Sequence, residues 1–181
     1  MLSYANGNDE AFEPLYQRHR LVVFRFFVRQ HFTKSVAEEL THDTWLKIIN
    51  ARLSYVVTAK FTTYLFTVAR RLAIDYQQKK SHLYEVLTEN AEVLAEDNKV
   101  QPQTTQSNSD DARNTQTLSL ALKQQIALLP FEQREVFLLK QEAGFSIEDI
   151  AKITQQNKEK VKSRWRYALQ KMRKGLSFYV N

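Results

Sequence analysis

The chain of 181 residues contains no cysteine, which excludes disulfides, thiol redox chemistry and cysteine-ligated zinc sites. It has only three glycines and three prolines, and this shortage of helix-breaking residues favours an all-α fold. Apolar runs are short, as at Leu21 to Phe24, which Arg25 interrupts. A membrane-spanning helix needs about 20 apolar residues, and the N-terminus shows no signal peptide pattern. We therefore expect a cytoplasmic protein without membrane insertion.

Apolar and basic residues, by contrast, are abundant. Hydrophobic residues make up 43% of the chain and aromatic residues 12%, which is enough to build a buried core. The net charge is +6 and the isoelectric point lies near 9.5. This excess of positive charge favours a polyanionic partner, and we expect nucleic acid rather than a membrane surface.

Charge also divides the sequence into three blocks. Residues 1–82 carry a net charge of +5, residues 83–117 carry −5 and residues 118–181 carry +6. The middle block ends in Gln101 to Gln116, which has almost no large apolar side chain and cannot offset the cost of ordering. We therefore predict two small helical domains, 1–82 and 118–181, joined by a flexible acidic and polar linker at 83–117.

The stretch from Ser146 to Lys174 predicts two helices joined by a polar turn. Ser146 is suited to cap the first helix, and Asp149 stands three residues on, in the position of a capping box. Asn157 is suited to cap the second helix. Many motifs of this kind carry glycine in the turn, whereas this chain has Thr154-Gln155 there.

The second of these helices has two different faces on a helical wheel. Its apolar face can pack on a core and consists of Val161, Trp165, Ala168, Leu169 and Met172. The opposite face offers cations, a hydroxyl, an amide and an aromatic ring, which are groups that bind phosphates and base edges in a DNA major groove. The pattern indicates a helix-turn-helix with a recognition helix, and an ordinary solvated helix pair is the alternative.

Five further helices are predicted, near 13–31, 34–51, 61–80, 117–128 and 130–141. The helix at 34–51 has apolar residues among acids on its second face, which indicates either a binding partner or a central helix covered on both sides by its own domain. The helix at 61–80 interleaves aromatic and hydroxyl groups with arginines, as suits stacking on unpaired bases and binding phosphates. For this helix, a plain amphipathic role is the alternative.

In combination, these segments resemble bacterial RNA polymerase sigma factors of the extracytoplasmic-function type, within the sigma-70 family. The family's opening helix is matched by AFEPLYQRHR and its polymerase-docking segment by AEELTHDTWLKI. The segment that melts the promoter −10 box is matched by FTTYLFTVARRLAIDY. The segments that read the −35 box are matched by LPFEQREVFLLKQEAGFSIEDIAKI and VKSRWRYALQKMRK. The resemblance covers nearly the whole chain outside the linker.

The resemblance implies a set of functional residues for each segment. Docking on core RNA polymerase would involve Glu39, His42, Asp43, Trp45 and Ile49. Binding of the −10 box as a single strand would involve Tyr55, Lys60, Phe61, Thr63, Tyr64, Arg70, Arg71 and Asp75. Contacts with duplex DNA at the −35 box would involve Lys160, Lys162, Ser163, Arg164, Arg166 and Tyr167. The family resemblance further implies inhibition by an anti-sigma factor.

Two other function classes were weighed. A stand-alone helix-turn-helix regulator, whose N-terminal domain senses a ligand or dimerises, would bind duplex DNA without polymerase. An enzyme is disfavoured because no Gly-rich phosphate loop or nucleophile elbow occurs, and the histidines show no metal-ligand spacing. These histidines are His19, His31, His42 and His82. We therefore expect a non-enzymatic protein with no cofactor and no metal site.

Overall fold

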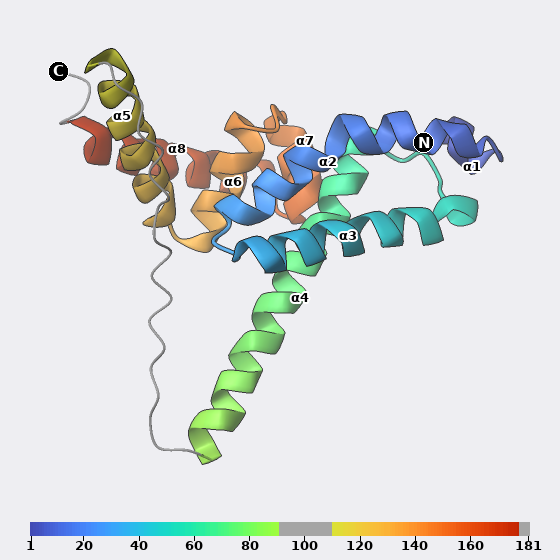
Figure 1. Cartoon of the computed structure of the whole chain (residues 1–181), viewed down its shortest axis with the longest axis horizontal. Helices are drawn as coiled ribbons and strands as arrows, with labels where there is room; N and C mark the ends of the chain where they lie inside the picture. Colours follow the sequence, from blue (N-terminus) through green and yellow to red (C-terminus); the bar gives the residue numbers. More distant parts are fainter. Residues whose placement is uncertain (91–109, 178–181) are drawn as a thin grey trace.

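The computed structural model of the chain describes residues 1–90 and 110–177, with side chains placed for 1–81 and 117–177. Every regular element in these residues is helical, which confirms the all-α class (Figure 1). The elements in order are α1 (Leu2–Ala5), η1 (Asp9–Ala11), α2 (Phe12–Arg29), α3 (Lys34–Asn50), η2 (Arg52–Ser54), α4 (Phe61–Asn90), α5 (Asp110–Ala127), α6 (Phe131–Gln141), α7 (Ile147–Thr154) and α8 (Lys158–Leu176).

The N-terminal bundle is formed by α2, α3 and α4 around an aromatic core. The ring of Phe26 lies edge-on to those of Phe27 and Phe66, with centroids 5.6 and 5.5 Å away. Such tilted aromatic pairs contribute beyond the area that they bury. Pro14 lies in the first turn of α2, where the backbone N–H that proline lacks would have no helical partner. The helices predicted near 13–31, 34–51 and 61–80 are thus confirmed as α2, α3 and α4.

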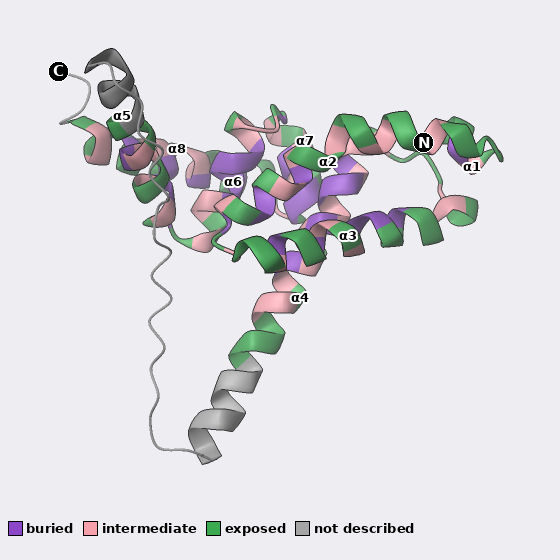
Figure 2. Ribbon diagram, viewed as in Figure 1, coloured by how far each residue is buried: buried purple, intermediate pink, exposed green. Residues whose placement is uncertain are grey.

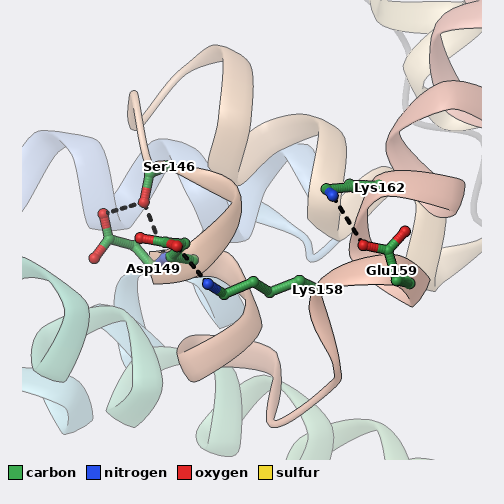
Figure 3. Close-up of polar contacts among 6 residues, drawn as sticks. Ser146, Asp149, Lys158, Glu159 and Lys162 are labelled. Carbon is green, nitrogen blue, oxygen red and sulfur yellow. Dashed lines mark hydrogen bonds and ion pairs between the residues drawn. The ribbon is translucent and has the colours of Figure 1, made fainter.

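The C-terminal bundle contains α5 to α8, and its two short final connections are capped as predicted. The Ser146 hydroxyl accepts a hydrogen bond from the backbone N–H of Asp149 at 3.0 Å, and Figure 3 shows the two side chains facing each other. Asn157 accepts one from the backbone N–H of Lys160 at 2.8 Å. These caps satisfy N–H groups that a helix start leaves without partners, so they set where α7 and α8 begin.

The turn between α7 and α8 is built without glycine. Gln155 adopts φ 54° and ψ 38°, the left-handed conformation that many helix ends give to glycine. Its backbone N–H bonds to the carbonyl of Lys152 at 3.3 Å. A non-glycine residue in this conformation is strained by about 1 kcal/mol or more, and the packing of α7 against α8 must compensate for this strain.

The two bundles pack directly on each other, with α4 against α7. Figure 1 shows α7 beside the first part of α4, whereas the end of α4 projects away from both bundles. The buried residues of the two bundles form one continuous cluster, which Figure 2 shows at the centre of the molecule. Phe66 of α4 meets Phe145, which precedes α7, at a centroid distance of 5.1 Å.

Helical structure extends into both ends of the range that the sequence predicts as a linker. Helix α4 continues to Asn90 and α5 begins at Asp110. Residues 91–109, which include part of the polar stretch that carries the linker prediction, lie outside the described residues. The exact boundaries of two domains and a linker stay a prediction.

Candidate nucleic-acid interface

The outward face of α8 carries most of the residues predicted to read duplex DNA. Lys160, Lys162, Arg166 and Tyr167 are exposed, and Ser163 is partly exposed. The apolar side of the same helix is buried on its bundle, as the wheel predicts, with Val161 and Ala168 at 0% exposure. The arrangement presents a cationic helix face with an aromatic ring to solvent, which suits the major groove.

Two lysines at the start of α8 are already paired with acids. Lys162 Nζ lies 2.8 Å from Oε1 of Glu159, and Lys158 bonds to Glu148 of α7 (Figure 3). Each lysine lowers the pKa of its partner carboxyl, chiefly through that hydrogen bond. All four side chains are exposed, so these pairs are weak and phosphates can compete for the lysines.

Arg164 is placed differently from its predicted neighbours. Only 8% of it is exposed, and its guanidinium pairs with Glu132 of α6. The side chain therefore holds α8 on α6 and does not belong to the exposed face of this structure. The resemblance placed Arg164 among the −35 contacts, but it could not show that an acid of another helix pairs with it.

The first half of α4 carries the residues predicted to bind the −10 strand, and several of them are covered. Thr63 is 2% exposed, and its hydroxyl donates to Oδ1 of Asp149 at 3.4 Å. Lys60 Nζ lies 3.6 Å from Oδ2 of the same carboxylate. Arg70 donates from Nε to Oε1 of Glu135 at 2.7 Å. In this structure these three side chains contact the C-terminal bundle.

The carboxyl pKa values of the two acids that contact α4, Glu135 and Asp149, are shifted in opposite directions. Glu135 is 0% exposed, and its burial raises the pKa of the carboxyl, while the Arg70 charge opposes that rise. Its second oxygen, Oε2, has no hydrogen-bond partner among the described residues. The pKa of Asp149 is lowered, mainly by the hydrogen bond from the Ser146 hydroxyl and also by the charge of Lys60. Ionised Asp149 is therefore favoured, whereas ionised Glu135 depends on nearby arginines.

The remaining −10 candidates are partly or fully exposed. Tyr55 and Tyr64 pack together with ring centroids 5.3 Å apart, and burial raises the pKa of the Tyr55 phenol. Phe61 is partly buried beside His19, at a centroid distance of 5.8 Å. Arg71 is exposed on the next turn of α4. The predicted −10 residues do not include the most open apolar groups beside this set, which are Leu53, Val56 and Val57 at 91%, 72% and 54% exposure.

Asp75 lies on another side of α4, in a groove with residues of α3. The groove has a volume of about 420 Å³ and also includes Glu39, Asp43 and Leu46. Two of these acids belong to the predicted polymerase-docking set, so the structure brings Asp75 together with docking residues and not with Thr63 or Arg70. The spacing along α4 contained this signal, because Asp75 is five residues from Arg70 and points elsewhere on the helix.

Only some of the predicted docking residues on α3 are exposed. Glu39 and His42 are exposed, and Ile49 is 36% exposed. Trp45 does not fit this face, since it is 3% exposed and its ring packs on those of Phe12 and Tyr16, at 5.9 and 5.1 Å. For Trp45 the alternative interpretation holds, in which the domain itself covers the second side of α3.

Leu46 is an exposed apolar residue on the docking face of α3. It is 41% exposed and was not among the predicted docking residues. It stands next to Trp45 in sequence, and the turn of the helix carries it away from the core. An exposed leucine beside acids suits contact with a partner, so Leu46 replaces Trp45 as the apolar candidate for docking.

The chain matches two descriptions of one protein family. "Sigma-70 region 2" matches residues 15–82, and "Sigma-70, region 4" matches residues 119–172. These ranges lie within the two predicted blocks, 1–82 and 118–181, and include the residues of α3, α4, α7 and α8 described above. Among the part of the chain that the structure describes, no helix is long and apolar enough to cross a membrane.

Curated relatives agree with these matches over most of the chain. CarQ of Myxococcus xanthus, an RNA polymerase sigma factor, is 29% identical over 83% of this chain and 80% of its own length. The ECF RNA polymerase sigma factor SigX of Bacillus subtilis is 23% identical over 92% of this chain and 84% of its own.

Solved structures share the fold. The sigma factor RpoE from Bartonella quintana, solved with the anti-sigma factor NepR, has a TM-score of 0.69 at 23% identity and covers 93% of this chain and 98% of its own. CnrH, solved with the cytosolic domain of CnrY, has a TM-score of 0.68 at 19% identity, over 97% of this chain and 94% of its own. With both regions present in order, the chain belongs to the sigma-70 family as an extracytoplasmic-function sigma factor, a transcription initiation factor that directs RNA polymerase to promoters.

Proposed function

We propose that the two bundles of this sigma factor divide promoter recognition between them. The exposed face of α8 reads the −35 box as duplex, through Lys160, Lys162, Arg166 and Tyr167. The observation that carries this assignment is the pair of capped helices α7 and α8, which buries Val161 and Ala168 and turns the cations outward. Arginine and lysine on such a face bind guanine and phosphates.

The start of α4 and the loop before it hold the −10 box as a single strand. Phe61 and Tyr64 supply aromatic rings, and stacking on an aromatic ring contributes about 1–3 kcal/mol per base. Unstacking a base costs a few kcal/mol, so melting is nearly balanced and contacts with polymerase decide it. Thr63 and Arg70 then bind the strand only when they are uncovered, whereas Lys60 is exposed and can exchange Asp149 for a phosphate.

Docking on core polymerase uses the groove between α3 and α4. Its acids Glu39, Asp43 and Asp75 lie around the exposed Leu46, which suits a partner surface that combines basic and apolar side chains. Bacterial RNA polymerase works in the cytoplasm, so we propose that this protein acts in the cytoplasm too. As an initiation factor it has no enzymatic activity of its own. The structural relative RpoE was solved with an anti-sigma factor, and we propose such an inhibitor for this chain as well.

The proposal is tested by pull-down of purified core polymerase, followed by transcription from a genomic promoter library and sequencing of the start sites. We expect stable binding and start sites that share two spaced boxes. Arg166→Glu should abolish starts that depend on the −35 box while core binding persists. The matched control is Lys123→Glu, an equal change of charge at an exposed residue of α5.

The stand-alone regulator predicts the opposite result. It would shift duplex DNA without polymerase and would not bind core enzyme. The match of residues 15–82 to sigma-70 region 2 argues against it, because a regulator needs no polymerase-docking bundle.

A further inference from the structure

A polar pocket of about 270 Å³ lies where the connection between α2 and α3 meets the later part of α4 and the start of α6. Its size is close to the lower end of the roughly 300–1,000 Å³ that small-ligand pockets occupy. The polar residues that line it include Gln30, His31, Thr33, Tyr76, Lys80 and Arg134. None of these residues belongs to the sets assigned above to promoter DNA or core polymerase, so the pocket has no part in the proposed function.

Gln30 brings a buried amide without hydrogen-bond partners to this pocket. The residue is 2% exposed, and neither Oε1 nor Nε2 has a partner among the described residues. A side-chain amide can both donate and accept hydrogen bonds, and leaving it unpaired in the interior is costly. Folded proteins keep few such groups, and a role in binding is one explanation for keeping them. A ligand with a hydroxyl or amide group would supply the missing donor and acceptor.

The pocket is also electropositive. Arg134 and Lys80 line it, and its lining residues include no acid. Arg134 donates from Nη1 and Nη2 to the carbonyls of Gln30 and Leu129, at 3.3 and 3.1 Å, while its buried Nε has no partner among the described residues. Burial lowers the pKa of Arg134, and no carboxylate opposes that effect. The guanidinium is thus held in place by neutral carbonyls, and its positive charge remains available to an anion.

The start of α3 adds partial positive charge to the same pocket. Thr33 caps this helix of 17 residues, and both Thr33 and Val36 line the pocket. The first N–H groups of a helix have no helical partner, and together with the helix dipole they favour an anion beside them. The Thr33 hydroxyl accepts from the N–H of Val36 at a long 3.4 Å, so an anion can compete for that N–H. Two cations and a helix start around one pocket suit a phosphate group.

We propose that this pocket binds a small phosphate ester. The phosphate lies between Arg134, Lys80 and the start of α3, which compensate its negative charge. The organic part lies against the ring of Tyr76, which meets that of Phe32 edge-on at a centroid distance of 5.5 Å, and pairs a hydroxyl or amide group with Gln30. Inorganic phosphate alone fills the cationic part but leaves the buried amide unpaired, and this difference favours the ester.

The binding experiment uses the full chain and a panel of sugar phosphates and mononucleotides. A thermal-shift screen compares each ester with its unphosphorylated parent and with inorganic phosphate, and calorimetric titration gives the affinities. We expect at least one ester to bind about tenfold or more tightly than both its parent and inorganic phosphate. The proposal is wrong if no ester binds more tightly than inorganic phosphate.

His31 reports where the charge of the ligand lies. Its pKa is lowered, first by burial and then by the charge of Arg134. An anion bound between Arg134 and Lys80 offsets the second cause, so the pKa of His31 should rise when the ester binds. Proton NMR follows this pKa in a pH titration, with the resonance assigned by its loss in His31→Gln. His19, whose ring lies beside Phe61 and outside the pocket, is the internal control and should titrate unchanged.

Two variants test the site without removing the arginine that holds the helix ends. Lys80→Gln should weaken binding of the ester about tenfold, because it removes a charged partner of the phosphate. Its matched control is Lys79→Gln, a change at the neighbouring exposed lysine outside the pocket, which should bind as wild type does. Gln30→Met should weaken binding to a similar extent and should not lower the melting temperature of the free chain, because the unpaired amide is gone.

The ester binds elsewhere, and the proposal is wrong, if both Lys80→Gln and Gln30→Met hold it as tightly as wild type. Failure of the chain to bind core polymerase contradicts the proposed function and leaves this site untouched, because the two rest on different residues.

Discussion

Helices α4 and α8 carry similar side chains toward DNA, yet the structure treats them in opposite ways. Both combine arginine or lysine with hydroxyl and aromatic groups on one face. On α8 that face is open, with Tyr167 at 51% exposure, whereas on α4 Thr63 is 2% exposed beneath the other bundle. The difference teaches that the amphipathic pattern of a helix shows which face is polar but not whether that face is free.

The ion pairs on the two helices differ for the same reason. The side chains of Lys162 and Glu159 on α8 are 58% and 80% exposed, so their pair contributes little and yields readily to phosphate. Those of Arg70 and Glu135 are 16% and 0% exposed, so separating them changes the solvation of a buried charge. The exposed Lys162–Glu159 pair leaves the polar face of α8 available, whereas the buried Arg70–Glu135 pair covers part of the polar face of α4.

The contrast between covered and open residues has its largest expected effect on α3. Trp45→Ala should lower the free energy of unfolding by about 3–5 kcal/mol, because it leaves a cavity beside Phe12 and Tyr16. Urea denaturation followed by circular dichroism measures this loss. Leu46→Ala, one residue on but exposed, should change stability by about 0.5 kcal/mol or less and should instead weaken binding to core polymerase. Equal stability losses for the two variants would contradict this placement.

The same contrast can be sharpened within α8, between Arg164 and Arg166. Arg164→Ala should destabilise the protein by about 1–3 kcal/mol, because it removes the packing and the ion pair that hold α8 on α6. Arg166→Ala should leave stability unchanged and weaken binding to −35 duplex DNA by about 1–3 kcal/mol. Thermal unfolding and a fluorescence anisotropy titration separate the two effects. The assignment of the exposed face would be wrong if Arg166→Ala bound that duplex as tightly as wild type.

The covered face also predicts a pH dependence. Burial raises the pKa of Glu135 above the ordinary value of 4.5, so the folded chain keeps a proton that the unfolded chain has already released. The free energy of unfolding should therefore fall as pH rises from 4.5 through the raised pKa. Glu135→Gln has no such titration, so the difference between wild type and variant, measured by urea denaturation at several pH values, should show that fall. A difference that is constant with pH would contradict the raised pKa.

The smallest expected effect concerns the turn that holds the open face in place. Gln155→Gly should raise stability by about 1 kcal/mol or less, because glycine adopts the left-handed conformation without strain, although it also gains freedom in the unfolded chain. Gln155→Asn, which tolerates the same conformation better than glutamine, should have a smaller effect of the same sign. Differential scanning calorimetry measures both. A loss of stability with glycine would show that the Gln155 side chain contributes more than its backbone costs.

Much of the fold and part of the candidate site could be predicted from the sequence. Ser146 and Asn157 have the right chemistry at the right spacing to cap α7 and α8, and their hydrogen bonds form as predicted. The outward position of Arg166 and Tyr167 follows from the helical period once Val161 and Ala168 are assigned to the core. These are short-range properties, in which a residue and its consequence lie within a few turns of one helix.

Only the tertiary structure decided which polar faces are covered. Arg70 and Glu135 are 65 residues apart in the chain, and nothing in the local pattern of either helix joins them. In the same way, the burial of Trp45 depends on Phe12 and Tyr16 of another helix, and that of Arg164 depends on Glu132. Composition and period determined an all-α chain with two polar helix faces, and the motifs along it carried the resemblance to sigma factors. Packing between distant segments decided that one face is open and the other closed, because burial is a property of neighbours that the local sequence does not contain.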